Sequence, residues 1–113
     1  MYKRQILDQV PVLQTPAVNA DESVTLAWNT VQGVDYYRIY RRIVGTKTYV
    51  CLEETEETGY TDTGGMPGNS YEYTVCGCHV GYQKDSYTKI AQAVQITVTG
   101  ENVNIQSAQK NQN

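Results

Sequence analysis

Three segments of this chain alternate apolar and polar residues with a period of two. They are residues 24–28, 37–41 and 71–75. In an extended strand this period places one set of side chains on a buried face and the other set in water. The first of these segments ends in the only Trp of the chain. The pattern therefore predicts an all-β protein with buried sheet faces, and it indicates no catalytic site.

The inward-facing positions of these segments form the predicted structural core. The core residues are Leu26, Trp28, Tyr37, Ile39, Tyr71, Tyr73 and Val75. The chain has ten Tyr and no Phe. In a thin sandwich a Tyr ring can lie in the core while its hydroxyl reaches water or a backbone carbonyl at the edge, so this composition suits two packed sheets.

The 113 residues suffice for one domain with a single core. Turn-forming residues separate seven predicted strands, at 12–18, 23–29, 36–43, 48–52, 58–62, 70–79 and 90–99. Seven short strands with regular turn signals are typical of a β-sandwich. We therefore expect a folded domain over residues 12–99. Residues 100–113 are predicted to be a polar linker or tail, because they are poor in apolar side chains.

The beginning of the chain is predicted to lie outside the domain. Residues 1–5 match the translation of a transposase-type sequencing adapter, GTG TAT AAG AGA CAG, with GTG read as a start codon. We expect residues 1–11 to be adapter-derived sequence and a lead-in, and the parent protein to continue upstream.

Charge and hydropathy argue against two classes of partner. The formal net charge is −3 and the Arg residues form no run, whereas a nucleic-acid surface needs a basic patch. No apolar stretch approaches the ~20 residues that a membrane helix requires. We therefore expect no nucleic-acid binding and no membrane insertion in this fragment.

Four motifs in order give the chain a family resemblance. They are V-T-L-A-W at 24–28, G-V-D-Y-Y-R-I-Y-R at 33–41, Y-T-D at 60–62 and G-M-P-G-N-S-Y-E-Y-T-V at 65–75. Over residues 12–99 the chain resembles the fibronectin type III domain, in the version repeated in surface proteins of Gram-positive bacteria. The resemblance implies a seven-stranded, immunoglobulin-like β-sandwich. It also implies that Trp28 lies between the sheets and that Tyr71 is a corner tyrosine bonded to upstream backbone.

The resemblance further implies a non-catalytic structural, spacer or adhesion module of a larger extracellular bacterial protein at the cell surface. The expected partners are neighbouring domains of the parent chain, and protein or glycan ligands; no cofactor is expected. Two alternatives remain: a carbohydrate-binding accessory module of a surface glycoside hydrolase, and a structural domain of a phage tail protein. The chain lacks a Gly-x-Ser-x-Gly motif, a phosphate-binding glycine loop and a His-Glu-x-x-His motif, so we expect no enzyme and no catalytic residues.

The sequence departs from the family pattern at residues 76–79, Cys-Gly-Cys-His. Together with Cys51, these residues could be a zinc site, a disulfide or free thiols. Strand alternation predicts that Cys76 and Cys78 point outward, and strand 36–43 is expected to separate Cys51 from them by about 9–10 Å, beyond disulfide reach. The favoured interpretation is three free thiols and no metal site.

The outward side chains of the same strands form the candidate interaction surface. It comprises Arg38, Tyr40, Tyr82 and Tyr87. Tyr and Arg are enriched at interfaces, and a Tyr ring can stack on a sugar; ordinary packing on a solvated sheet is the competing interpretation. The acidic residues 53–57 are predicted to be a solvated loop, because a calcium site needs a defined ligand spacing that is absent. Asp62 is predicted to be a turn residue that bonds local backbone.

Overall fold

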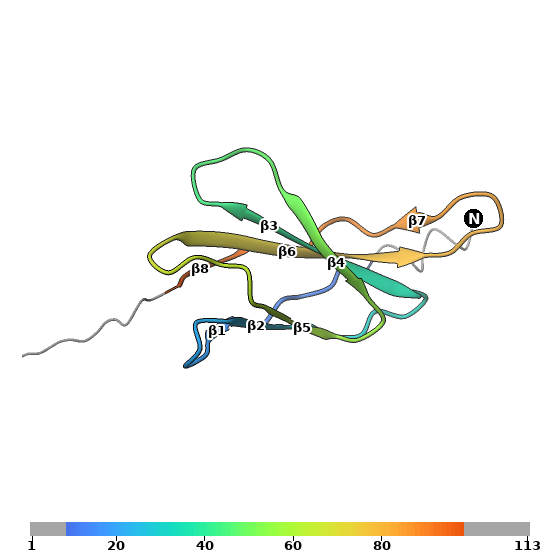
Figure 1. The fold of residues 1–113 in the computed structure, drawn as a ribbon. Coiled ribbons are helices and arrows are strands. Elements are labelled where there is room, and N and C mark those ends of the chain that lie inside the picture. The colour runs from blue at the N-terminus through green and yellow to red at the C-terminus, as the bar shows by residue number, and fades with distance from the viewer. Residues whose placement is uncertain (1–8, 99–113) are drawn as a thin grey trace, which may run out of the picture.

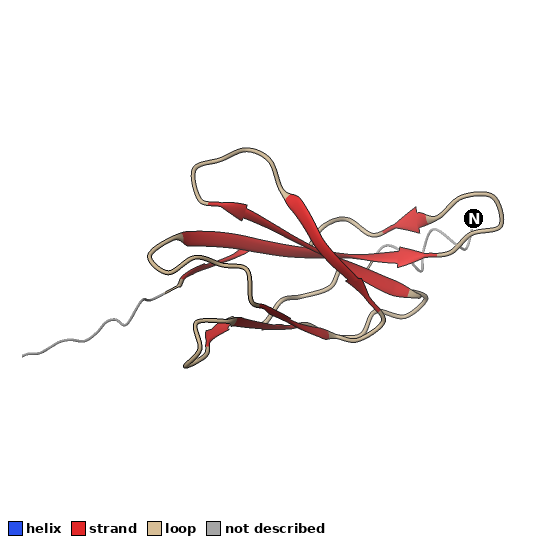
Figure 2. Cartoon of the chain, viewed as in Figure 1, coloured by secondary structure: helices blue, strands red, loops and turns tan. Residues whose placement is uncertain are grey.

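The computed structural model describes residues 9–98, which form two antiparallel β-sheets and no helix (Figures 1 and 2). The smaller sheet has the order β1-β2-β5, with β1 (Ala17–Val18), β2 (Val24–Ala27) and β5 (Gly59–Asp62). The larger sheet has the order β4-β3-β6-β7, and β8 also pairs with β6. Its strands are β3 (Tyr36–Ile43), β4 (Val50–Thr55), β6 (Ser70–His79), β7 (Ser86–Tyr87) and β8 (Val94–Thr97). The predicted all-β sandwich is confirmed.

The two sheets lie one above the other in Figure 1, with β1, β2 and β5 in the lower layer. A core of side chains from both sheets fills the space between them. All seven predicted core residues belong to it: Leu26, Trp28, Tyr37, Ile39, Tyr71, Tyr73 and Val75. The Trp28 and Tyr37 rings meet edge to face, with centroids 5.6 Å apart. This geometry is favoured by the ring quadrupoles, and it joins the two sheets at their centre.

The buried Tyr residues use their hydroxyls at the edges of the core. The Tyr37 hydroxyl accepts a hydrogen bond from the Val31 N–H at 2.9 Å. The Tyr71 hydroxyl accepts one from the Met66 N–H at 2.8 Å, five residues upstream. Tyr71 therefore makes the corner contact that the resemblance implied.

The described chain has eight strands, one more than predicted. The additional strand, β7, lies in the predicted loop 80–88, and the predicted strand 90–99 is reduced to β8. Cys78 pairs with Tyr87, and Tyr73 pairs with Val94. The paired residues are five positions apart on β6 but seven positions apart on the chain that runs from β7 to β8. The two extra residues interrupt the ladder between β7 and β8, as a bulge does.

The first predicted strand, 12–18, is also shorter in the structure. Only β1 and an isolated bridge between Leu13 and Trp28 remain of it. Pro16 lies between them and has no N–H to donate to a ladder, which explains the break. Most of the predicted lead-in, residues 1–11, and all of the predicted tail, residues 100–113, lie outside the described residues.

Within residues 9–98 the structure contains no helix long and apolar enough to span a membrane.

Candidate interaction surface

The side of the larger sheet that points away from the core is called the outer face here. Its residues are Cys51 and Glu54 of β4, Tyr36, Arg38, Tyr40 and Arg42 of β3, Glu72, Thr74, Cys76 and Cys78 of β6, and Tyr87 of β7. Tyr37 and Ile39 of β3 lie in the core, so strand alternation places their neighbours on this opposite face. The pairing of Arg38 with Cys76 and of Tyr36 with Cys78 aligns the two central strands.

Three of the four predicted surface residues lie on the outer face. The Arg38 guanidinium lies 5.2 Å from the centroid of the Tyr87 ring, and Tyr40 is half-buried beside Arg38. Tyr82 lies in the loop between β6 and β7 and is 99% exposed. The structure therefore brings Arg38, Tyr40 and Tyr87 together and leaves Tyr82 outside their cluster.

Each Arg on the outer face has a carboxylate partner. The Arg38 Nε donates to the Glu54 Oε2 at 2.7 Å, and this hydrogen bond is the main reason why the pKa of Arg38 is raised. Arg42 pairs with Glu72. The Tyr36 hydroxyl donates to the Asp85 Oδ2 at 3.0 Å. The charges of this face are thus largely neutralised within the sheet.

The two Cys residues of β6 point to the outer face, as predicted, but they are buried there. Cys76 is 5% exposed and Cys78 is fully covered. Alternation fixes the side of the sheet but not the exposure, because exposure depends on the size of the neighbouring side chains. Burial raises the pKa of the Cys76 thiol and raises that of Cys78 to about 12. Both thiols are therefore protonated at neutral pH.

All three Cys residues are free in the structure. Cys51 is exposed and pairs in register with Tyr40, whose other neighbour is Thr74 of β6. Strand β3 separates Cys51 from Cys76, as the sequence predicted. Among residues 9–98, no group of three or more His, Cys, Asp or Glu side chains is placed to hold a metal ion.

The acidic run is not a loop throughout, which corrects the prediction for residues 53–57. Strand β4 continues to Thr55, and Glu53 and Glu54 pair with Ile39 and Arg38. The ion pair with Arg38 compensates the low β propensity of Glu54.

A buried ionic cluster lies between the sheets and was missed by sequence reasoning. Asp62 is 3% exposed. Its Oδ2 accepts hydrogen bonds from Arg41 at 2.7 Å and from the Tyr73 hydroxyl at 2.6 Å. The backbone N–H of Gly64 also donates to Asp62, so the predicted local turn contact is present but is only part of its role. The sequence did contain one indication of this cluster. Arg41 lies two residues after Ile39, so strand alternation points it toward the core, where a charged side chain needs a buried partner.

A second missed pair joins the only His to a carboxylate. The His79 Nδ1 lies 3.0 Å from the Asp35 Oδ2 at the end of β6, and both side chains are partly exposed. Ser86 pairs with His79 in register, yet no hydrogen bond links their side chains among the described contacts. Asp35 also accepts a hydrogen bond from the Val80 N–H at 2.7 Å. This bond connects the end of β6 to the loop that precedes β3.

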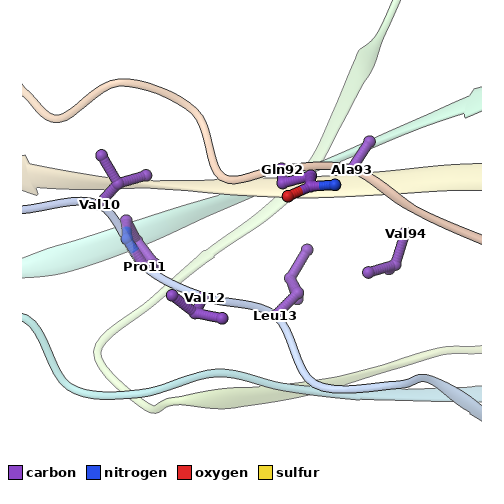
Figure 3. Close-up of a pocket in the computed structure, with 7 residues that line it drawn as sticks. All are labelled: Val10, Pro11, Val12, Leu13, Gln92, Ala93 and Val94. Carbon is purple, nitrogen blue, oxygen red and sulfur yellow. The ribbon is translucent and has the colours of Figure 1, made fainter.

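An apolar groove runs along one open side of the sandwich (Figure 3). It has a volume of about 450 Å³. One wall is the segment preceding β1 and the other is the segment entering β8, and the lining residues are Val10, Pro11, Val12, Leu13, Gln92, Ala93 and Val94. None of its lining residues belongs to the outer face, and none has an ionisable side chain, which makes the groove unsuited to acid–base chemistry.

No protein-family model and no curated protein matches the chain. Solved structures do match. A fibronectin-type-III-like protein from Clostridium thermocellum has a TM-score of 0.69 at 19% identity, covering 95% of this chain and 99% of that one. A β-1,2-glucanase from Parabacteroides distasonis has a TM-score of 0.65 at 28% identity, with 82% of this chain covered but only 14% of the glucanase.

A third match is a pectate lyase from Erwinia chrysanthemi, with a TM-score of 0.62 at 18% identity over 77% of this chain and 28% of the lyase. The fold thus occurs both as a separate chain and as a part of larger proteins. With its two sheets, its central Trp28 and its corner Tyr71, this chain has the fold of a fibronectin type III domain.

Proposed function

We propose that this chain is a non-catalytic structural module that holds neighbouring parts of a larger extracellular bacterial protein at a fixed separation. The observation that carries the proposal is the internal pairing on the outer face. Arg38 and Arg42 are each bound to a carboxylate of the same sheet. A face that satisfies its own charges has little electrostatic free energy to gain from a partner, and this supports a positioning role.

The matches to larger proteins agree with this role. The chain corresponds to 14% of the glucanase and 28% of the pectate lyase, so in both proteins the shared fold is one part among several. A compact domain of two packed sheets can set the distance between such parts. Fold likeness alone does not define an activity, so the proposal depends on the outer face itself.

The alternative is a carbohydrate-binding accessory module. Two observations favour testing it: the glucanase match at 28% identity, and the exposed rings of Tyr82 and Tyr87. If these rings stack on pyranoses, each should contribute ~1–3 kcal/mol to binding, comparable to an aromatic hot spot.

A glycan array with plant and cell-wall polysaccharides distinguishes the two functions. The purified domain is compared with the double variant Tyr82→Ser/Tyr87→Ser. A matched control is Tyr49→Ser, which removes the ring that lies beneath Arg42 at the other end of the sheet. We expect no binding by any of the three proteins. Reproducible glycan binding by the parent domain and by the Tyr49→Ser control, but not by the double variant, would contradict the spacer function. It would show that the chain is a carbohydrate-binding module.

A further inference from the structure

Two thiols lie side by side in a protected position on the outer face. Cys76 and Cys78 are separated by one residue on the central strand β6, and their side chains point in the same direction. Both are buried, and their spacing on one strand makes them same-face neighbours. The role of a spacer does not use this pair.

The strand geometry decides which bond the pair can form. Two steps along a strand separate the Cα atoms by ~6.6–7 Å, and the side chains are parallel. A disulfide needs Cα atoms within about 6.8 Å and side chains that converge to ~3.8 Å at Cβ, so the strand would have to distort. A single ion between the sulfurs requires only that they lean together to ~4.6 Å, taking each metal–sulfur bond as ~2.3 Å, as in zinc sites.

The number of ligands selects the ion. Structural zinc and iron–sulfur clusters each need about four protein ligands. The described residues offer no third His, Cys, Asp or Glu at this place, and Cys51 lies two strands away. A soft monovalent ion that accepts two thiolates in a line fits what is present, and Cu(I) is the biological ion of this class.

The charge of the complex follows from the exchange of protons for the ion. When one Cu(I) replaces the two S–H protons, both protons leave, copper keeps its oxidation state, and the complex carries one negative charge. Arg38 pairs with Cys76 in the ladder, which places a cationic residue beside the site. Arg38 and Tyr87, the cross-strand partners of Cys76 and Cys78, contact each other beside the two thiols.

We propose that Cys76 and Cys78 form a two-coordinate binding site for Cu(I), next to Arg38 and Tyr87 on the neighbouring strands.

Titration of the reduced protein with Cu(I), without oxygen and against a chromophoric Cu(I) chelator, tests this site. We expect the parent and Cys51→Ser to bind one Cu(I) per chain and to release two protons for each ion bound. Cys76→Ser and Cys78→Ser should each weaken binding by more than about 100-fold, the upper range for loss of an outer-shell partner. Arg38→Gln, which removes only such a partner, should weaken it by about 10–100-fold.

X-ray absorption at the copper edge counts the ligands of Cu(I) bound to the parent protein. This measurement uses no variant, so it does not depend on whether the variants fold. We expect two sulfur neighbours and no further ligand. The proposal is overturned if the parent does not bind Cu(I), if three or more ligands surround the copper, or if Cys51→Ser weakens binding as strongly as Cys76→Ser. Tight zinc binding that Cys76→Ser abolishes would overturn the two-coordinate assignment.

Discussion

Asp62 is a buried residue whose carboxylate is held from three directions. Its buried carboxylate receives hydrogen bonds from Arg41, Tyr73 and the Gly64 N–H. Burial alone would raise the pKa of Asp62, but these donors outweigh burial and lower it. The pKa is therefore below that of the unfolded chain, and Asp62 stabilises the fold above about pH 3.9. This contribution is lost as the pH falls through the folded-state pKa.

Replacing Asp62 by Asn should destabilise the domain by ~3–5 kcal/mol at pH 7, because Arg41 then has no carboxylate partner between the sheets. Urea unfolding of the variant and the parent measures the difference, which should shrink as the pH is lowered below about 4. The control is Glu72→Gln, whose ion pair with Arg42 is partly exposed and should contribute only ~0–1 kcal/mol. Equal losses in the two variants at pH 7 would contradict the role of Asp62.

The Tyr71 hydroxyl gives a second prediction at this scale. Tyr71→Phe keeps the ring but leaves the Met66 N–H without its partner, which should cost ~1–3 kcal/mol. Tyr82→Phe removes a hydroxyl from a fully exposed ring and should change the stability by less than about 0.5 kcal/mol. Thermal unfolding of both variants checks the contrast; a Tyr71→Phe midpoint equal to that of the parent would show that the corner contact is dispensable.

At the scale of elements, strand β6 shows what alternation can and cannot predict. The side chains of Tyr71, Tyr73 and Val75 occupy the core, as their phase predicts. The same phase placed Cys76 and Cys78 on the other face, but it could not foresee their burial, since that depends on cross-strand neighbours. The division between β7 and β8 was equally hidden, because two extra residues in a segment of mixed polarity, 88–93, leave no hydropathy signal.

Gly77 provides a test of packing within β6. A Cβ at this position would lie 2.6 Å from the Val34 Cγ2, well inside contact distance. Gly77→Ala should therefore destabilise the domain by ~1–3 kcal/mol through overpacking. Adding Val34→Ala removes the obstructing methyl groups, so the double variant should lose less than the sum of the two single losses. Additive losses in urea unfolding would exclude this contact as the cause.

For the whole molecule, Trp28 is the side chain on which both sheets depend. Trp28→Ala should cost ~3–5 kcal/mol, a large part of the ~5–15 kcal/mol that stabilises a typical domain. Trp28→Phe should cost less, since the indole Nε1 has no hydrogen-bond partner among the described residues and none is lost. Unfolding monitored by circular dichroism compares the variants; parental stability in Trp28→Ala would show that the sandwich does not need this ring.

The two edges of the larger sheet decide whether crowded copies of this domain can pair through their strands. One edge is strand β4, which carries Glu53 and Glu54. The other edge is formed by β7 and β8, and its ladder with β6 is interrupted between these two strands. Charged or interrupted edge strands resist pairing with the edge of another molecule. Crowded copies of the domain should therefore not join through these two edges of the larger sheet.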